Sequence, residues 1–179
     1  HTTLTASADT LNFVSIADGA SAFNLNLNAA TALVMGDVDV GGDLHAVVQS
    51  GGVSQLPNTG LTIGGQATFT ADTGSRQVAA LSNANNTFTG VLTLNQINNG
   101  SWADVSVTTD SALTLGALQS AGTVDLQTQG ALTTSTLTTS GNLTISSHGG
   151  AVSIGEAVVS GAMTVQTQGG SVSQTGQFV

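Results

Sequence analysis

Apolar and polar positions in the C-terminal part of the chain repeat with a period of about twenty residues. When residues 112–130, 131–150 and 151–170 are aligned with one another, their apolar side chains fall into shared columns. The columns are Leu113, Leu132, Val152 and Val172; Val124, Leu143 and Met163; and Leu126, Ile145 and Val165. Two more columns hold only glycine: Gly122, Gly141 and Gly161, and Gly130, Gly150 and Gly170. Short alternating runs at a fixed spacing predict strands stacked into a solenoid.

We therefore predict an all-β fold, a right-handed parallel β-helix with about 20 residues per coil. The length favours a single domain over residues 1–179, with about nine coils. Within it, we expect regular repeats over residues 112–179 and less regular coils over residues 32–111. Residues 1–31 are expected to form either an irregular coil or a capping segment, because solenoid ends need atypical coils. The apolar columns would then stack into aliphatic ladders around the axis.

Earlier parts of the chain carry fainter copies of the pattern. The stretch Gly42–Gln55 parallels Gly161–Gln174, which extends the repeat beyond the C-terminal part. Leu56–Gly60 contains the only proline and predicts a turn or small outward loop. Asn-rich clusters at Asn83–Asn86 and Asn98–Gly100 predict two further turns.

The composition excludes several classes of function. Charged residues make up 6% of the chain, against a usual share of about 25%. With one cation and a net charge of -9, the chain is a poor candidate for binding nucleic acid or an anionic membrane. The absence of cysteine excludes disulfides and thiolate metal sites, and no apolar run has the roughly 18 residues of a membrane span. The chain begins at His1 without a visible signal peptide, so we expect a processed product or a piece of a longer protein.

Carboxylates are the first candidates for chemistry. Asp37, Asp39 and Asp43 form the only dense acidic set, and three carboxylates can hold Ca²⁺ at millimolar strength. Asp37 and Asp39 would share the outward face of a strand, because Val38 and Val40 are apolar. We favour solvated coil-face carboxylates over a calcium site, and whether the three bind calcium stays open. The single cation, Arg76, lies in a predicted corner near Asp72 and is interpreted as a turn residue rather than a catalytic base.

Other polar residues give weaker signals. His1, His45 and His148 are far apart in the sequence, and the serines show no nucleophile motif. Threonine columns at Thr114, Thr133 and Ser153, and at Asp125, Thr144 and Thr164, are too short and broken for an ice-binding face. Glycosylation sequons begin at Asn85, Asn99 and Asn142 and are interpreted as chance matches. The lone Trp102 is expected to be buried at a coil corner. We expect no catalytic residues, cofactor or metal.

Two resemblances to known families arise from these residues. Residues 112–170 resemble the repeats of filamentous haemagglutinin-type adhesins, and residues 80–94 are similar to the passenger-associated repeat of autotransporters. The latter match centres on Asn86-Thr-Phe-Thr-Gly90 before a strand. The resemblance implies a parallel β-helix, type V secretion through the outer membrane of a Gram-negative bacterium, and roles in adhesion, aggregation or biofilm formation. No secretion domain or translocating barrel is recognisable, and such exoproteins are commonly far longer.

These observations predict a non-enzymatic structural and adhesive segment of an extracellular fibre or surface adhesin. Its expected partners are neighbouring copies or other segments of its parent chain, through end-to-end or lateral β contacts, with glycans as further candidates. The alternative from another class is a glycan-active β-helix enzyme, either a polysaccharide lyase or a hydrolase. The sequence does not decide between a spacer and a self-assembling filament.

Overall fold

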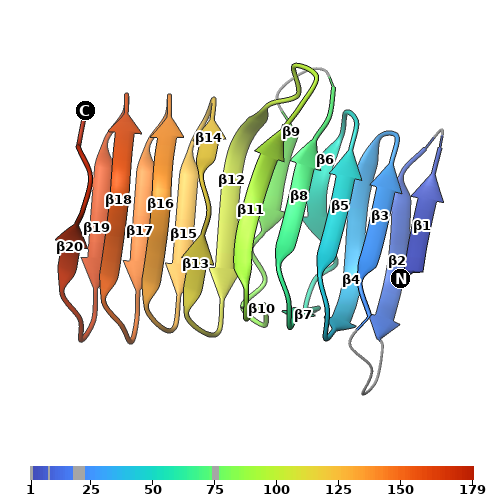
Figure 1. Ribbon diagram of the computed structural model, residues 1–179, viewed down its shortest axis with the longest axis horizontal. Coiled ribbons are helices and arrows are strands. Elements are labelled where there is room, and N and C mark those ends of the chain that lie inside the picture. The colour runs from blue at the N-terminus through green and yellow to red at the C-terminus, as the bar shows by residue number, and fades with distance from the viewer. Residues whose placement is uncertain (1, 8, 18–22, 74–76) are drawn as a thin grey trace.

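The computed structural model describes residues 2–7, 9–17, 23–73 and 77–179. In this part of the chain every regular element is a β-strand, and the strands stand side by side along one axis to form a rod (Figure 1). The fold is a parallel β-solenoid of about eight turns, which confirms the predicted class. The right-handed sense follows from the general rule for parallel crossovers and stays a prediction.

The predicted count of nine coils is too high because coil length varies along the rod. Residues stacked on one another are 19 apart at Val105 and Val124, but 26 apart at Val53 and Ala79. The longer coils lie in the middle of the chain, where polar loops are inserted between the strands. The expected period of about twenty residues therefore holds in the C-terminal half and lengthens before it.

Three sets of strands build the rod, and each set is a ladder of parallel neighbours. The long ladder runs from end to end through β2 (Leu11–Ala17), β4 (Ala32–Val40), β6 (Gly52–Gln55), β9 (Gln77–Leu81), β12 (Trp102–Thr109), β15 (Val124–Thr128), β17 (Leu143–Ser147) and β19 (Met163–Thr167). The N-terminal ladder contains β1 (Thr2–Ala6), β3 (Leu25–Ala29), β5 (Leu44–Val48), β8 (Ala67–Ala71) and β11 (Val91–Gln96). The C-terminal ladder contains β13 (Leu113–Leu115), β14 (Leu118–Ser120), β16 (Leu132–Thr139), β18 (Val152–Val159) and β20 (Val172–Gln174).

Two short strands complete the middle coils. β7 (Leu61–Ile63) pairs with the second half of β4, and β10 (Thr87–Phe88) pairs with β7. In the C-terminal half one long strand takes the place of two short ones. β16 pairs with β13 through its first residues and with β14 through its last. The first strands, β1 and β2, pair in register with β3 and β4, so they belong to the stack as a coil.

The aliphatic columns lie where the repeat predicts them. Leu113 pairs with Leu132, Leu132 with Val152, and Val152 with Val172. The columns that begin at Val124 and Leu126 continue in register through β17 to β19. Their members up to β17 and β18 are buried and belong to one continuous core. Burying each such side chain contributes about 1.5–3 kcal/mol, so the stack of coils is the main source of stability.

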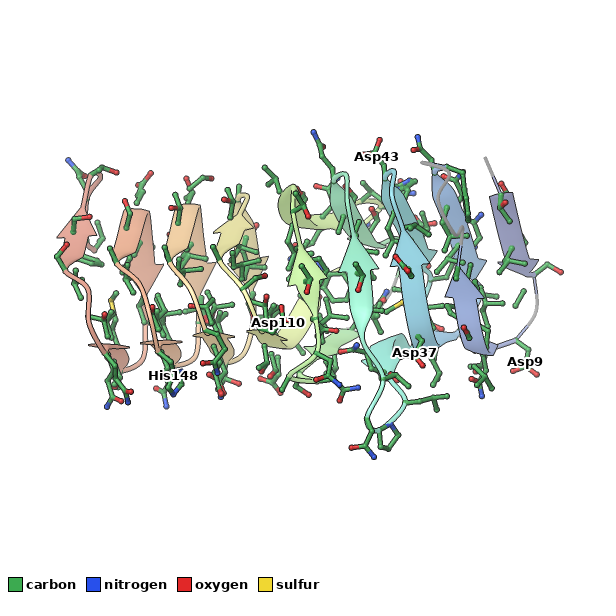
Figure 2. All side chains as sticks on the ribbon, turned by 90° about the horizontal axis from the view of Figure 1, so that it is seen from below. Asp9, Asp37, Asp43, Asp110 and His148 are labelled. Atoms are coloured by element: carbon green, nitrogen blue, oxygen red, sulfur yellow. The ribbon has the colours of Figure 1, made fainter. Side chains whose placement is uncertain are left out.

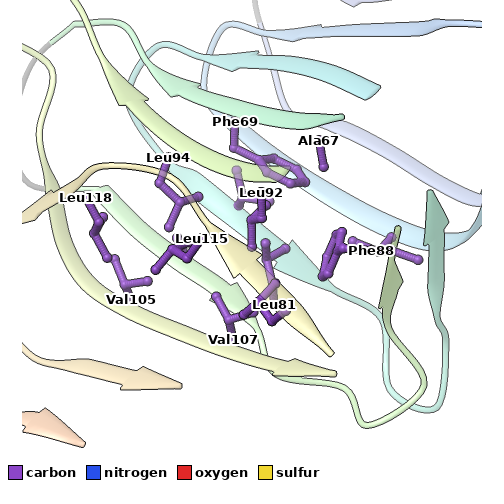
Figure 3. Packing of buried hydrophobic residues seen from close by; sticks show 14 of the residues in the cluster. Ala67, Phe69, Leu81, Phe88, Leu92, Leu94, Val105, Val107, Leu115 and Leu118 are labelled. Carbon is purple, nitrogen blue, oxygen red and sulfur yellow. The ribbon is translucent and has the colours of Figure 1, made fainter. Parts of the chain in front are cut away.

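The middle of the rod has a bulkier core than the C-terminal half. Figure 3 shows Phe69, Leu92 and Leu115 among the side chains that converge there from different strands. Phe69, Phe88 and Trp102 are all buried in this region. Longer coils enclose a wider interior, and aromatic side chains fill it where aliphatic ones would leave voids.

Some corner residues bond one coil to the next through side-chain oxygens. At several corners an Asn or Asp lies directly before a strand or, for Asp104, within β12, and its Oδ1 atom accepts the backbone N–H of the corresponding residue one coil later. These pairs are Asn24 with Asp43 at 2.9 Å, Asp43 with Gln66 at 2.8 Å, Asp104 with Thr123 at 2.8 Å, and Asn142 with Ala162 at 2.9 Å. Such a bond satisfies an N–H at a corner where the ladder pairing is interrupted.

A second type of corner uses buried hydroxyls. Thr109, Thr128, Ser147 and Thr167 form one column at the ends of β12, β15, β17 and β19. Thr128 Oγ1 donates to the Gly130 carbonyl at 2.7 Å, and Ser147 Oγ donates to the same carbonyl at 2.8 Å. The glycine column lies beside these hydroxyls, and a Cβ atom at Gly150 would come within 2.3 Å of the Ala131 nitrogen. Only glycine fits there, which explains that column.

The two matching stretches found in the sequence lie on different faces of the rod. Leu44–Val48 pairs with β3 and β8 in the N-terminal ladder, whereas its sequence counterpart, Met163–Thr167, ends the long ladder. Because the coils between them are longer than the repeat, the intervening chain does not complete a whole number of turns. The sequence repeat is therefore real, but it shifts in phase against the coil.

Candidate binding surface

The acidic set of β4 and the following corner does not converge on one point. Asp37 and Asp39 are exposed on the outer face of β4, and their neighbours Val38 and Val40 are buried, as predicted. Figure 2 shows Asp37 and Asp43 near different edges of the rod. Asp37 Oδ1 accepts the Gly60 N–H at 2.9 Å, and Asp43 Oδ1 accepts the Gln66 N–H at 2.8 Å.

Metal ligation therefore has no geometric support in this part of the molecule. Among the described residues, no three His, Asp or Glu side chains lie close enough together to hold a metal ion. His45 is exposed on β5 between the buried Leu44 and Ala46, and His148 is exposed beside a corner. His1 and Arg76 lie outside the described residues, and Asp72 accepts a 2.6 Å hydrogen bond from Asn98 Nδ2.

The Asn86–Gly90 motif forms a buried polar junction rather than an exposed site. Asn86 is fully buried and exchanges two hydrogen bonds with the Gln55 amide, at 2.7 Å and 3.0 Å. Asn86 Nδ2 also donates to the Leu81 and Thr108 carbonyls, and Asn86 Oδ1 accepts the Leu61 N–H. The motif thus joins three consecutive coils, which makes its role structural.

The environments of Trp102 and of the three sequon asparagines are explained by burial, exposure and corner bonding. Trp102 is fully buried, and its Nε1 atom donates to the Asn95 carbonyl at 3.0 Å, which confirms the predicted corner burial. Of the sequon residues, Asn85 and Asn99 are exposed, while Asn142 forms the corner bond to Ala162. The described residues contain no helix of the length and hydrophobicity needed to cross a bilayer.

Uncharged side chains form most of the outer surface of the C-terminal half. Thr114, Thr133 and Ser153 stack in register on one face. On the long ladder, Thr144 and Thr164 follow Asp125, and Ser146 lies between Gln127 and Gln166. Hydroxyls and amides both donate and accept hydrogen bonds, so these rows repeat the same neutral contacts from coil to coil.

Backbone pairing between coils is also interrupted where the N-terminal ladder gives way to the C-terminal ladder. We call this place the seam: the junction between β10 and β11 on one side and β13 and β14 on the other. β11 pairs with β13 only at Val91↔Thr114 and Leu92↔Leu115, and β14 pairs with β12 only at Trp102↔Ser120. Between these points no backbone pairing joins β11 to β14 within residues 91–120, all of which are described.

The seam opens into a surface groove of about 310 Å³. Its lining residues are Leu94, Asn95, Gln96, Ala117, Leu118, Gln119, Thr136 and Thr138. Leu94 and Leu118 are buried and form an apolar floor, whereas Asn95, Ala117 and Gln119 are exposed along its sides. A smaller hollow of about 100 Å³ continues the groove through the shared residues Gln96 and Gln119 toward Ser101 and Ser140.

The groove is closed at one point by a side chain rather than by backbone pairing. Gln96 Nε2 donates to the Gln119 carbonyl across the seam. Sequence patterns did not single out the groove residues, because the groove arises from missing pairing and not from an unusual residue. The only signal is local: the regular repeat begins at residue 112, and Gly116-Ala117 interrupts the apolar alternation between Leu115 and Leu118.

Comparisons with known proteins place the chain by its repeats alone. No curated protein and no solved structure matches it. A family model described as repeats of unknown function (DUF5649) matches residues 22–95, 103–158 and 140–179. The matches cover both the longer middle coils and the regular C-terminal ones, so the same repeat underlies both parts of the solenoid. The chain therefore belongs to the DUF5649 family of repeats of unknown function.

Proposed function

We propose that this chain is a non-enzymatic structural and adhesive segment of an extracellular fibre or surface adhesin. The observation that carries this proposal is the register of its uncharged outer rows. Threonine, serine, asparagine and glutamine side chains repeat from coil to coil on a rigid stack, as in the rows of Thr114 and Gln127. A surface of this kind presents several similar weak contacts in register, which suits adhesion to a repetitive partner.

The resemblance to filamentous haemagglutinin-type and autotransporter repeats supports the same proposal. It suggests secretion to the cell surface of a Gram-negative bacterium and roles in aggregation or biofilm formation. The partners would be neighbouring copies or other segments of its parent chain, through lateral or end-to-end β contacts, and glycans. Only 6% of the residues are charged, so most of the outer rows can contact a neighbour without burying a charge, whereas the net charge of -9 opposes close packing of copies at low salt.

Adhesion and turnover assays test the proposal together. Beads coated with the protein should cluster or bind to bacterial surfaces, whereas beads coated with an unrelated soluble protein should not. In parallel, polyuronides and neutral polysaccharides should show no new reducing ends and no unsaturated products after prolonged incubation. Sustained lyase or hydrolase activity would favour the alternative, a glycan-active β-helix enzyme, and would overturn the non-enzymatic proposal.

A further inference from the structure

The seam groove differs from the rest of the rod surface because the coils are not paired beneath it. Where strands of neighbouring coils pair, as β8 does with β11 and β14 with β16, the outer side chains stand on a closed sheet. At the seam this pairing stops between Leu92 and Ser120, and the outer side chains border a hollow. A concave site with an apolar floor and polar sides is the usual form of a small-ligand site.

The lining determines the charge of a matching ligand. None of the side chains that line the groove or its extension is ionisable. A charged ligand would lose hydration there without gaining an opposite charge. The amides of Asn95, Gln96 and Gln119 and the hydroxyl of Thr138 offer donors and acceptors in nearly equal measure. Such a set suits a neutral ligand that carries many hydroxyl groups.

The spacing across the seam argues against an added peptide strand. A strand inserted between two coils would have to separate them to about twice the 4.8 Å distance between paired strands. The bridges Val91↔Thr114 and Leu92↔Leu115 hold the coils together at one end, and the Gln96 amide spans to the Gln119 carbonyl. A ligand must therefore lie over the gap on the outer surface, where side chains make the contacts.

We propose that the seam groove binds a neutral oligosaccharide. Sugar hydroxyls would bond to Asn95, Gln119 and Thr138, and the C–H face of a sugar ring would lie on Ala117 above the apolar floor. No aromatic side chain lines the groove, and Trp102 is fully buried, so we expect weak binding with a dissociation constant of about 1 mM. This inference rests on the proposed function, because it names a ligand for one surface of an adhesive rod.

Amide NMR of the intact 17.6 kDa chain provides the test. Cellohexaose, maltohexaose and fully N-acetylated chitohexaose serve as neutral probes, hexagalacturonate as the anionic probe, and a neutral Thr/Gln-rich decapeptide as the alternative class. We expect at least one neutral hexasaccharide to cause saturable shifts at Asn95, Gln96, Gln119 and Thr138. Hexagalacturonate and the peptide should leave these signals in place.

Two matched variants locate the site. Gln119→Arg places a long cation in the groove and should weaken the binding at least about tenfold. Gln166→Arg makes the same change on an exposed residue of β19, outside the groove, and should alter the affinity by less than about twofold. The fold of each variant is checked from the unchanged amide signals of the remaining coils.

Each outcome decides between the proposals. The groove proposal is overturned if no neutral hexasaccharide causes localised shifts, or if hexagalacturonate or the peptide binds more strongly. Neither result would contradict the proposed adhesive function. Equal weakening by the two variants overturns the groove proposal as well, because the binding would then be non-local. Cleavage of a probe during the titration would instead overturn the proposed non-enzymatic function, since new reducing-end signals would appear.

Discussion

The C-terminal coils and the middle coils close their corners in different ways. From β13 onward, each corner uses one short element: a glycine, a buried hydroxyl such as Thr128 or Ser147, or a single Asn such as Asn142. In the middle, coils with longer inserts close around the Asn86–Gln55 amide pair and the buried Gln77 and Trp102. The regular corners repeat the same few bonds from coil to coil, whereas the middle corners use networks of unlike partners.

This difference determines how local each interaction is. A corner bond such as Asn142 to Ala162 joins two neighbouring coils and is repeated elsewhere with other residues. Asn86 instead bonds to residues from three coils and has no repeated equivalent. We therefore expect substitutions in the middle network to cost more than those at regular corners, while the inward columns remain the most sensitive positions everywhere.

Of the substitutions considered, Leu143→Asp should cause the largest loss of folding stability. Leu143 is buried between Val124 and Met163, so a carboxylate there would lie in the aliphatic column without a partner. We expect a loss of more than about 4 kcal/mol and no cooperative thermal transition by circular dichroism. The outward Ser146→Asp on the same strand should cost less than about 0.5 kcal/mol, and equal damage by both would contradict the assigned facing.

Asn86→Ala tests the middle network. The change leaves the Gln55 amide, the Leu61 N–H and two backbone carbonyls without their partner, so we expect a loss of about 3 kcal/mol or more. Urea unfolding measures this loss against Asn85→Ala, which alters an exposed neighbour and should be nearly neutral. A loss below 1 kcal/mol for Asn86→Ala would remove the distinction between networks and single-bond corners.

Asn142→Ala tests a regular corner. Its Oδ1 atom accepts one hydrogen bond, from the Ala162 N–H, at an exposed position where water can replace it. We therefore expect a loss of about 1 kcal/mol by urea unfolding. Asn142→Asp keeps an acceptor in the same place and should recover most of the difference. If the aspartate variant is no more stable than the alanine variant, the corner bond does not contribute.

A pair of threonine-to-valine variants sharpens the comparison within the regular coils. Thr128 and Thr134 are both buried, but Thr128 Oγ1 donates to the Gly130 carbonyl while Thr134 Oγ1 has no hydrogen-bond partner. Thr128→Val should destabilise by about 1 kcal/mol, and Thr134→Val should stabilise by a similar amount. Thermal denaturation of both variants measures the difference, and a shift of the same sign in both would contradict the hydroxyl assignment.

Removal of divalent cations should have the smallest effect. Asp37 and Asp43 each accept a backbone N–H at a different corner and do not face a shared point. We expect excess EDTA to change the melting temperature by less than about 1 °C, because no three His, Asp or Glu side chains of the described residues converge on a point where an ion could bind and stabilise the fold. A marked fall, reversed by Ca²⁺, would show that Asp37, Asp39 and Asp43 form a site after all.

The sequence predicted the regular half of the fold closely, because there each inward position recurs once per coil. The columns at Leu113, Val124 and Leu126 follow from that period alone. Coil number was overestimated, since inserted residues in the middle coils have no period to reveal them. The Asn86–Gln55 pairing was not predictable either, because it joins residues 31 apart through a tertiary contact. The groove depends on where strand pairing stops, which no residue pattern encodes directly.

The repeated corners also affect how the number of coils in such a rod can change during evolution. In the regular half, every coil presents the same column of apolar side chains to its neighbour, as Val124, Leu143 and Met163 do. Duplicating or deleting one such coil in the gene would leave each remaining interface complete. The number of coils in the C-terminal half can therefore change during evolution without other substitutions. In the middle, the coils have unique partners, so they must be kept or lost together.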